Sequence, residues 1–155
     1  MNPDIVSLDT LLKQESDLQF TQFDHTTGWA LGELLHQRAL QKQVALVIEV
    51  FAFQQVIYRV ATAGAQPEQH HWVERKRASV LRFGHSTYFL GQSHAARGKV
   101  FEEKDYIDAR VYAGHGGGFP LRLRNMGVIG AVTVSGLPQE EDHQWVVDAL
   151  TTLLG

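Results

Sequence analysis

The residues most suited to chemistry lie in one short glycine-rich stretch. His115 is followed by Gly116, Gly117 and Gly118, and Gly114 precedes it. Glycine adopts positive φ angles without steric cost and lets a ligand approach the backbone closely, and consecutive backbone N–H groups can bind an anion. The stretch therefore predicts a loop that binds a flat or anionic ligand. The alternative is an ordinary tight turn between a helix and a strand, for which glycine is equally typical.

A second group of candidate binding residues follows the predicted strand that ends near Val134. Ser135 and Gly136 offer a hydroxyl group and backbone N–H groups close to a helix that is predicted to begin around Pro138. The N-terminus of a helix attracts anions. Acidic residues in the first turn of this helix weaken that attraction, but the position still favours an anionic group of a ligand.

A basic run on a predicted helix supplies the third group of candidates. Arg75, Lys76 and Arg77 are consecutive, and Arg82 follows them. Guanidinium and ammonium groups form charge-assisted hydrogen bonds with carboxylates and phosphates. We therefore expect Arg75 and Lys76 to contribute to ligand binding. A solvated helix face is the alternative explanation of the run.

Two familiar catalytic motifs are absent. HGGG is similar to the oxyanion loop of lipases and esterases, but the chain has no G-x-S-x-G nucleophile elbow to accompany it. The nearest string is GQSHA at residues 91–95, which lacks the final glycine. No P-loop is present either. These absences argue against a serine hydrolase and against a P-loop nucleotide-binding site.

The eight histidines show no compact metal-binding spacing. His70 and His71 are adjacent, so on a helix their side chains diverge by about 100° and do not easily share one ion. Asp142 and His143 are adjacent too, and for the same reason we do not expect them to act as an acid–base pair.

Composition limits the class of protein. The chain has 155 residues, 44% of them hydrophobic, which predicts one domain over residues 1–155 with a single core. A formal charge of −3 and a pI near 6.2 give no reason to expect nucleic acid or an anionic membrane as a partner. Cysteine is absent, which excludes disulfides and thiolate catalysis. Without a recognisable export signal or membrane span, a cytoplasmic location is expected.

The hydrophobic pattern predicts helices and strands that would position these candidates. Helices are expected near residues 4–16, from an Asp24 cap to about residue 40, near 70–84, from a Ser86 cap to about residue 98, near 105–113, and from about Pro138 to the C-terminus. Strands are expected at 18–23, 44–51, 56–62, 119–124 and 127–134. Short links between neighbouring strands predict an α+β fold, with a central antiparallel sheet of about five strands flanked by helices.

The segment HGGGFPLRLRNMGVIGAVTVSGLPQEEDH resembles the second half of the haem-degrading-domain family of the GlcG and HbpS type. The stretches FDHTTGWALGELL, WVERKRASVLRFGHST and YAGHGGGFP are similar to a free-standing cytoplasmic branch of that family, so the resemblance covers nearly the whole chain. It implies a compact profilin-like fold that is frequently assembled into homo-oligomers. It also implies haem as a possible ligand, because some members bind haem and are credited with degrading it.

These observations lead to one functional hypothesis and two alternatives. The hypothesis is a small-molecule-binding domain for an anionic or tetrapyrrole ligand such as haem. Its expected contacts are His115, Gly116, Gly117, Gly118, Ser135, Gly136, Arg75 and Lys76. His115 is the predicted ligand of the haem iron, since imidazole is a common proximal ligand. The alternatives are a haem-degrading enzyme and a homo-oligomeric accessory protein acting through protein contacts, which exposed Trp72 and Phe119 would favour.

Overall fold

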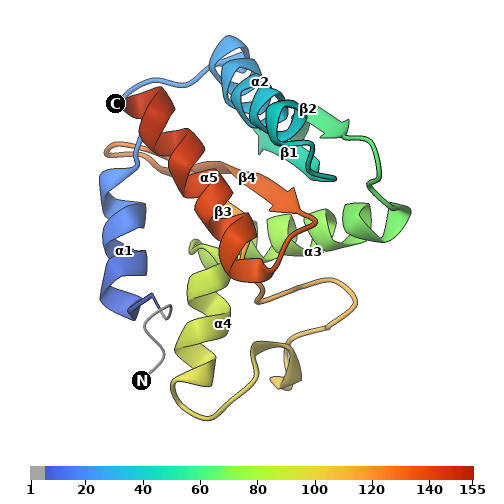
Figure 1. Ribbon diagram of the computed structural model, residues 1–155. Coiled ribbons are helices and arrows are strands. Elements are labelled where there is room, and N and C mark those ends of the chain that lie inside the picture. Colours follow the sequence, from blue (N-terminus) through green and yellow to red (C-terminus); the bar gives the residue numbers. More distant parts are fainter. Residues whose placement is uncertain (1–5) are drawn as a thin grey trace.

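A computed structural model describes residues 6–155 of the chain (Figure 1). The helices are α1 (Leu8–Asp17), α2 (His25–Lys42), α3 (Pro67–Phe83), α4 (Thr87–Ala95) and α5 (Gln139–Leu154), with a 3₁₀ turn η1 (Phe101–Glu103). The strands are β1 (Val47–Ala52), β2 (Gln55–Ala61), β3 (Gly118–Leu123) and β4 (Gly127–Ser135). The predicted α+β class is therefore confirmed.

The strands form one antiparallel sheet in the order β2-β1-β4-β3. As predicted, β3 and β4 are neighbours in a hairpin, in which Gly118 is paired with Thr133 and Leu123 with Gly127. Asn125 and Gly127 have φ angles of 66° and 95° in the connecting turn, and these two residue types tolerate such angles best. The hairpin places the glycine-rich stretch beside the end of β4.

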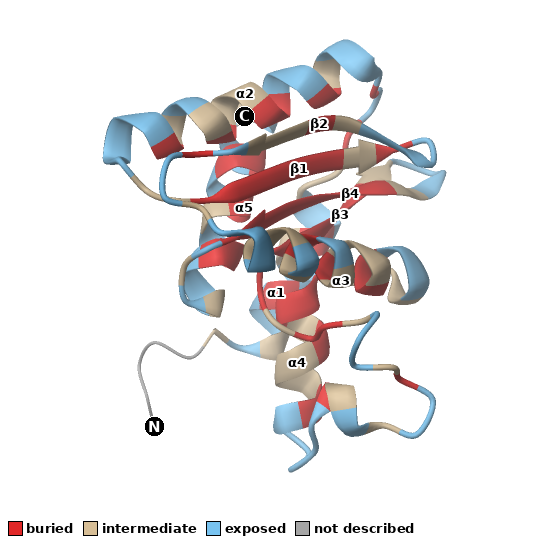
Figure 2. Ribbon diagram, turned by 90° about the vertical axis from the view of Figure 1, so that its right-hand side faces the viewer, coloured by how far each residue is buried: buried red, intermediate tan, exposed pale blue. Residues whose placement is uncertain are grey.

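Helices cover both faces of the sheet. Figure 1 shows α5 crossing one face, where it and α2 enclose the main hydrophobic core, while α3 lies on the opposite face. Alternation along the strands explains this division, since Ile48 and Val50 of β1 point into the core and Val47 and Glu49 point toward α3. Figure 2 shows β1 and β4 buried along most of their length and β2 at the more exposed edge.

Local capping chemistry fixes the helix ends as the sequence predicts. The Asp24 carboxylate accepts a hydrogen bond from the Thr27 N–H at 2.9 Å, and the Ser86 hydroxyl accepts one from the Phe89 N–H at 3.2 Å. Gly84 ends α3 in the left-handed conformation with a φ angle of 71°. The predicted start of the first helix partly lies outside the described residues, which begin at residue 6.

Two expected elements are not present in residues 6–155, where the sheet has four strands rather than the expected five or so. Residues 18–23 form only an isolated parallel bridge between Phe20 and Leu123. Phe20 and Phe23 are both buried in the main core three positions apart, so the segment anchors to the core instead of alternating between two faces. The expected helix over 105–113 is a series of turns, because the Asp108 side chain accepts a hydrogen bond from the Arg110 N–H at 2.9 Å and competes with helix formation.

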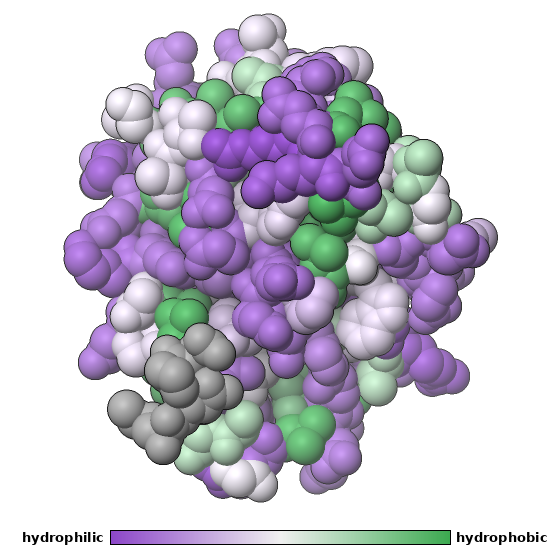
Figure 3. Space-filling model, in the orientation of Figure 1, coloured by the Kyte–Doolittle hydropathy of each residue, from purple (hydrophilic) through white to green (hydrophobic). Residues whose placement is uncertain are grey.

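The surface of α2 carries the large aromatic side chain of Trp29. Its side chain is 53% exposed and packs edge-on against Tyr58 of β2. On the face drawn in Figure 3, hydrophobic residues lie in small groups separated by hydrophilic ones. Within residues 6–155, no helix has both the length and the apolar character required to cross a membrane.

Candidate functional site

A cavity of about 300 Å³ brings several of the predicted residues together between α3, the glycine-rich loop and the start of α5. Its lining consists of Glu68, Gln69, Trp72, Lys76, His115, Ser135, Gly136, Leu137, Gln139 and Asp142. His115, Lys76, Ser135 and Gly136 were predicted from the sequence as ligand-binding residues. Four other residues predicted to bind the ligand are close in sequence to lining residues but do not line the cavity themselves: Gly116, Gly117, Gly118 and Arg75.

The glycines allow close packing of backbone on backbone. A Cβ atom at Gly117, whose φ angle is 135°, would collide with the carbonyl oxygen of Val134. Two of the loop's N–H groups are used inside the protein: Gly116 donates to Gln139 Oε1 at 3.0 Å, and Gly118 donates to Thr87 Oγ1 at 2.9 Å. The loop is thus held by internal hydrogen bonds rather than presenting a row of free N–H groups.

His115 has a fixed orientation at the cavity wall. Its Nδ1 lies 3.0 Å from Glu102 Oε2, and the same oxygen accepts a hydrogen bond from the Gly114 N–H at 2.6 Å. Burial disfavours the charge of Glu102, but the hydrogen bonds from His115 and Gly114 outweigh it and lower the pKa of Glu102. An ionised carboxylate only accepts, so it favours the tautomer with the proton on Nδ1. Nε2 then carries the lone pair, and no residue among 6–155 forms a hydrogen bond with it.

A buried ion pair forms the inner end of the cavity. Lys76 Nζ lies 3.2 Å from Asp142 Oδ2 and donates a second hydrogen bond to the Val134 carbonyl at 3.0 Å. The two side chains are 3% and 2% exposed. Burial raises the pKa of Asp142 to about 6, an effect that Lys76 partly offsets, and burial lowers the pKa of Lys76, which Asp142 partly offsets.

Asp142 also occupies the anion position at the start of α5. Its carboxylate accepts hydrogen bonds from the Gly136 N–H at 3.3 Å and from the Leu137 N–H at 3.0 Å. The Gly136 N–H, which was predicted to bind a ligand, therefore already donates to the carboxylate of Asp142. The Ser135 hydroxyl has no hydrogen-bond partner within the described residues and remains available at the cavity wall.

The basic run does not form one patch, because its members leave α3 in different directions. The Arg75 guanidinium lies 4.0 Å from the centre of the Trp72 ring and donates to the Ala109 carbonyl at 3.2 Å. Arg77 pairs with the buried Glu49 of β1 at 3.1 Å, on the far side of the helix from Arg82. Lys76 and Arg75 are the members that adjoin the cavity.

Asp142 and His143 diverge as predicted. His143 is buried behind the glycine-rich loop, where its Nε2 lies 2.8 Å from Gln14 Oε1. Burial lowers the pKa of His143 to about 4, so the ring is neutral at pH 7. No group of three or more His, Cys, Asp or Glu side chains within residues 6–155 is placed to hold a metal ion.

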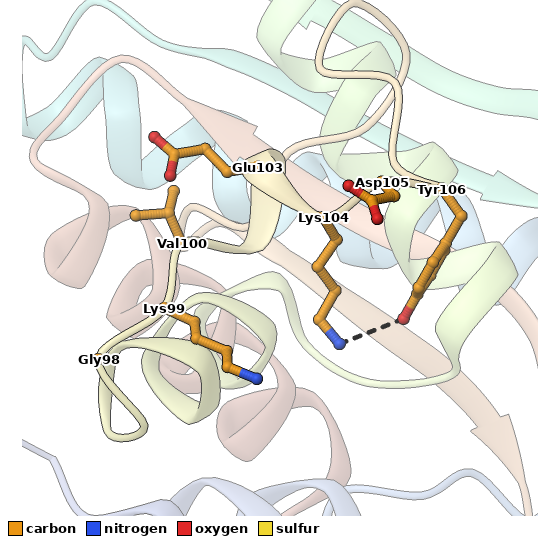
Figure 4. A pocket seen from close by; sticks show the side chains of 7 residues that line it. All are labelled: Gly98, Lys99, Val100, Glu103, Lys104, Asp105 and Tyr106. Atoms are coloured by element: carbon orange, nitrogen blue, oxygen red, sulfur yellow. Dashed lines mark hydrogen bonds between the residues drawn. The ribbon is translucent and has the colours of Figure 1, made fainter.

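A larger hollow of about 460 Å³ lies away from these groups (Figure 4). Its lining comes from one surface segment, and Lys104 Nζ donates to the Tyr106 hydroxyl at 3.2 Å across it. All the lining residues except Lys104 are exposed. It is a surface depression without buried titratable groups, so the smaller cavity beside α3 is the candidate functional site.

Comparison with known proteins shows which family the whole chain resembles. The model of the family described as haem degrading protein HbpS-like matches residues 23–151. A UPF0303 protein of Psychromonas ingrahamii is 49% identical over 148 residues, covering 96% of this chain and 93% of that protein. Another from Streptomyces coelicolor is 40% identical over 153 residues, covering 99% and 97%.

Solved structures share the fold. The crystal structure of the Ybr137w protein has a TM-score of 0.87 and 27% identity, covering 96% of this chain and 88% of that one. The HbpS crystal structure has a TM-score of 0.67 at 19% identity, covering 88% and 93%. A structure described as a PduOC:heme complex has a TM-score of 0.69 at 19% identity, covering 83% and 93%.

Proposed function

The chain belongs to the HbpS-like family of haem-degrading proteins, and from this premise we propose that its cavity beside α3 binds a small planar ligand, haem being the first candidate, with His115 as the ligand of the haem iron. The structure described as a PduOC:heme complex, which has a similar fold, supports the choice of haem for the first test. Membership of the family does not establish which ligand is bound, so the choice of haem is part of our proposal.

The observation that carries this proposal is the position of the His115 ring relative to Glu102. Metal-ligating histidines commonly donate their other N–H to a carboxylate, which fixes the tautomer and orients the ring. Glu102 stands in that relation to Nδ1 of His115 at 3.0 Å and leaves Nε2 without a protein partner among the described residues. The side chain is 44% exposed, so a ligand reaches Nε2 without unfolding of the loop.

The aromatic wall of the cavity and the guanidinium group beside it suit a flat ligand with a carboxylate at its edge. Trp72 forms an aromatic wall, with its ring centre 5.1 Å from that of His115. Arg75 lies against Trp72 and 3.9 Å from the exposed Glu68 carboxylate, and we assign its guanidinium group to a ligand carboxylate near the opening. Lys76 is less suited to this role because Asp142 already neutralises it.

The volume limits how much of the ligand enters. Small-molecule sites range from roughly 300 to 1,000 Å³, and this cavity of about 300 Å³ lies at the lower end. It accommodates one edge of a tetrapyrrole or the whole of a smaller planar compound. When bound, haem supplies the redox chemistry of its iron. The residues of this chain supply the Nε2 lone pair, its orientation by Glu102 and the aromatic wall.

Titration with hemin tests the proposal. The wild-type protein should show saturable binding with a shift of the Soret band, and His115→Ala should abolish the shift. Arg75→Ala should weaken binding with less change in the spectrum, because it contacts the ligand edge and not the iron. His71→Ala provides the matched control, because His71 is an exposed residue of α3. This variant should bind hemin as the wild-type protein does.

The outcomes separate the ligand from the site. Saturable binding with the same spectrum in His115→Ala would reject His115 as the iron ligand. Absence of saturable binding by the wild type would reject haem. Mass spectrometry of the native protein as purified would then identify any smaller ligand retained in the cavity.

A further inference from the structure

Lys76 has chemistry that iron binding at His115 does not use. Its amino group lies at the inner end of the cavity, 3% exposed, and is the only lysine among the lining residues. Two of its possible hydrogen bonds go to Asp142 and the Val134 carbonyl. An ammonium group has three N–H donors, so one remains for a bound molecule. Gly117 packs closely against this amino group, because a Cβ atom at residue 117 would lie 2.7 Å from Nζ.

We propose that Lys76 captures a small planar aldehyde or ketone as a reversible Schiff base, with Asp142 as its proton-transfer partner. A nucleophilic lysine must be neutral, and a desolvated site favours the neutral amine. The inference rests on the proposed cavity being a ligand site, but it does not depend on iron or on His115.

The step balances with these two side chains and the carbonyl compound alone. The Lys76 ammonium first passes a proton to the Asp142 carboxylate, 3.2 Å away. The amine lone pair then forms an N–C bond to the carbonyl carbon, the C=O π bond breaks, and a proton moves from nitrogen to oxygen to give a carbinolamine. Asp142 returns its proton to the hydroxyl group, which leaves as water. The product is a protonated imine beside the Asp142 carboxylate, and no oxidant or reductant is consumed.

The environment of the pair supports each part of this sequence. Burial lowers the pKa of Lys76 and raises that of Asp142 to about 6, which brings the two proton affinities closer together. The Gly136 and Leu137 N–H groups hold the carboxylate in place at 3.3 and 3.0 Å. A group poised near the working pH is what general acid–base catalysis of imine formation needs.

The remaining walls define the class of carbonyl compound. One face of Trp72 is covered by the Arg75 guanidinium 4.0 Å away, and the cavity is only about 300 Å³ in volume. Leu137 contributes an apolar wall, and Ser135 a hydroxyl group without a described partner. These features fit a compact conjugated carbonyl compound rather than a long aliphatic one.

Reductive trapping on the wild-type protein tests the inference directly. The native protein is incubated at pH 7 with pyridine-4-carboxaldehyde and cyanoborohydride, and modified lysines are located by peptide mass spectrometry. The chain has five lysines, so Lys13, Lys42, Lys99 and Lys104 act as internal controls. Lys76 should be modified at least about 10-fold faster than these four. The same reaction in guanidinium should remove that preference, because unfolding abolishes the cavity.

A second measurement separates a chemical role of Asp142 from a structural one. Asp142→Asn should lower the trapping rate at Lys76 by about 100-fold, the lower end of what a positioned acid or base contributes. Its circular dichroism and the slow modification of the four control lysines should match the wild type if it is folded. Modification confined to the four exposed or half-exposed lysines in native wild-type protein would overturn the inference. Hemin binding without trapping would overturn this inference alone, whereas trapping without hemin binding would overturn the haem proposal alone.

Discussion

The buried imidazole of His143 links the packing behind the glycine-rich loop to pH. Burial lowers its pKa from 6.5 to about 4. The unfolded chain therefore binds more protons than the folded chain between these two pH values, and stability contributed by the neutral ring is lost as the pH falls. Asp142 acts in the opposite direction, because its pKa is raised from 3.8 to about 6 in the folded state.

We expect acidification from pH 6.5 to 4 to lower the free energy of unfolding of the wild type relative to His143→Gln. The difference should be on the order of 3 kcal/mol, since one pKa unit corresponds to about 1.4 kcal/mol. Urea denaturation of both proteins at several pH values measures it, and the shared Asp142 cancels in the comparison. If the difference in the free energy of unfolding between the two proteins did not change with pH, burial would not lower the pKa of His143 in the folded state.

At the scale of single residues, the sequence predicted which residues lie near one another better than it predicted how they pair. His115, Ser135 and Lys76 line one cavity, because the glycine-rich loop lies next to α3 and the end of β4. The Lys76–Asp142 pair was not predicted, because its members are 66 residues apart and local patterns do not report such contacts. A signal existed, since Val73, Lys76 and Val80 fall at i, i+3 and i+7, the spacing of a buried helix stripe.

Among the elements, the glycine-rich loop makes the most specific structural demand. Gly117 combines a φ angle of 135° with backbone packing too close for a Cβ atom. Gly117→Ala should therefore lower the free energy of unfolding by about 2 kcal/mol or more through strain and collision with Val134. Gly127→Ala is the matched control, because Gly127 has a φ angle of 95° but no neighbouring atom within 4 Å of an added Cβ.

Urea denaturation of the two variants separates backbone strain from close packing. The smaller loss is expected for Gly127→Ala, which suffers only the strain of a positive φ angle. Equal losses in both would contradict a packing role for Gly117. Hemin titration of Gly117→Ala then reports whether displacement of this loop also alters the cavity.

Elements with local signals were predicted well, and those defined by distant contacts were not. Asp24, Ser86 and Gly84 cap helices through interactions within four residues, and the 119–134 hairpin has its turn residues between its strands. Residues 18–23 were misassigned because Phe20 bridges to Leu123, a residue about a hundred positions away. The turns over 105–113 are an exception, because their signal is local and was overlooked: the Asp108 side chain accepts a hydrogen bond from the Arg110 N–H, two residues further on, and competes with a helix.

For the whole molecule, the exposed edge of the sheet bears on assembly. β2 is one of the two outer strands in the order β2-β1-β4-β3, so one row of its backbone N–H and C=O groups has no strand partner within the described residues. Large hydrophobic side chains gather near it: Phe53 and Val56 are each 45% exposed, and Trp29, which packs on Tyr58 of β2, is 53% exposed. By contrast, Phe119 is fully buried and Trp72 is half-buried at the cavity, so the exposed Phe119 that would favour the accessory-protein alternative is not present.

We expect the protein to form a homo-oligomer through this edge, with Phe53, Val56 and Trp29 at the contact. Apolar side chains beside an open strand are well suited to pairing between copies of a chain, because association buries the side chains and satisfies the backbone. Light scattering at micromolar concentration should give a mass clearly above 17.4 kDa.

Val56→Lys should weaken association by about 10-fold or more, equivalent to at least about 1.4 kcal/mol. Val111→Lys, at a residue that is also 45% exposed but outside this edge, should not. A monomeric mass for the wild type at every concentration and salt level would exclude the oligomer, and equal effects of the two substitutions would move the contact away from β2.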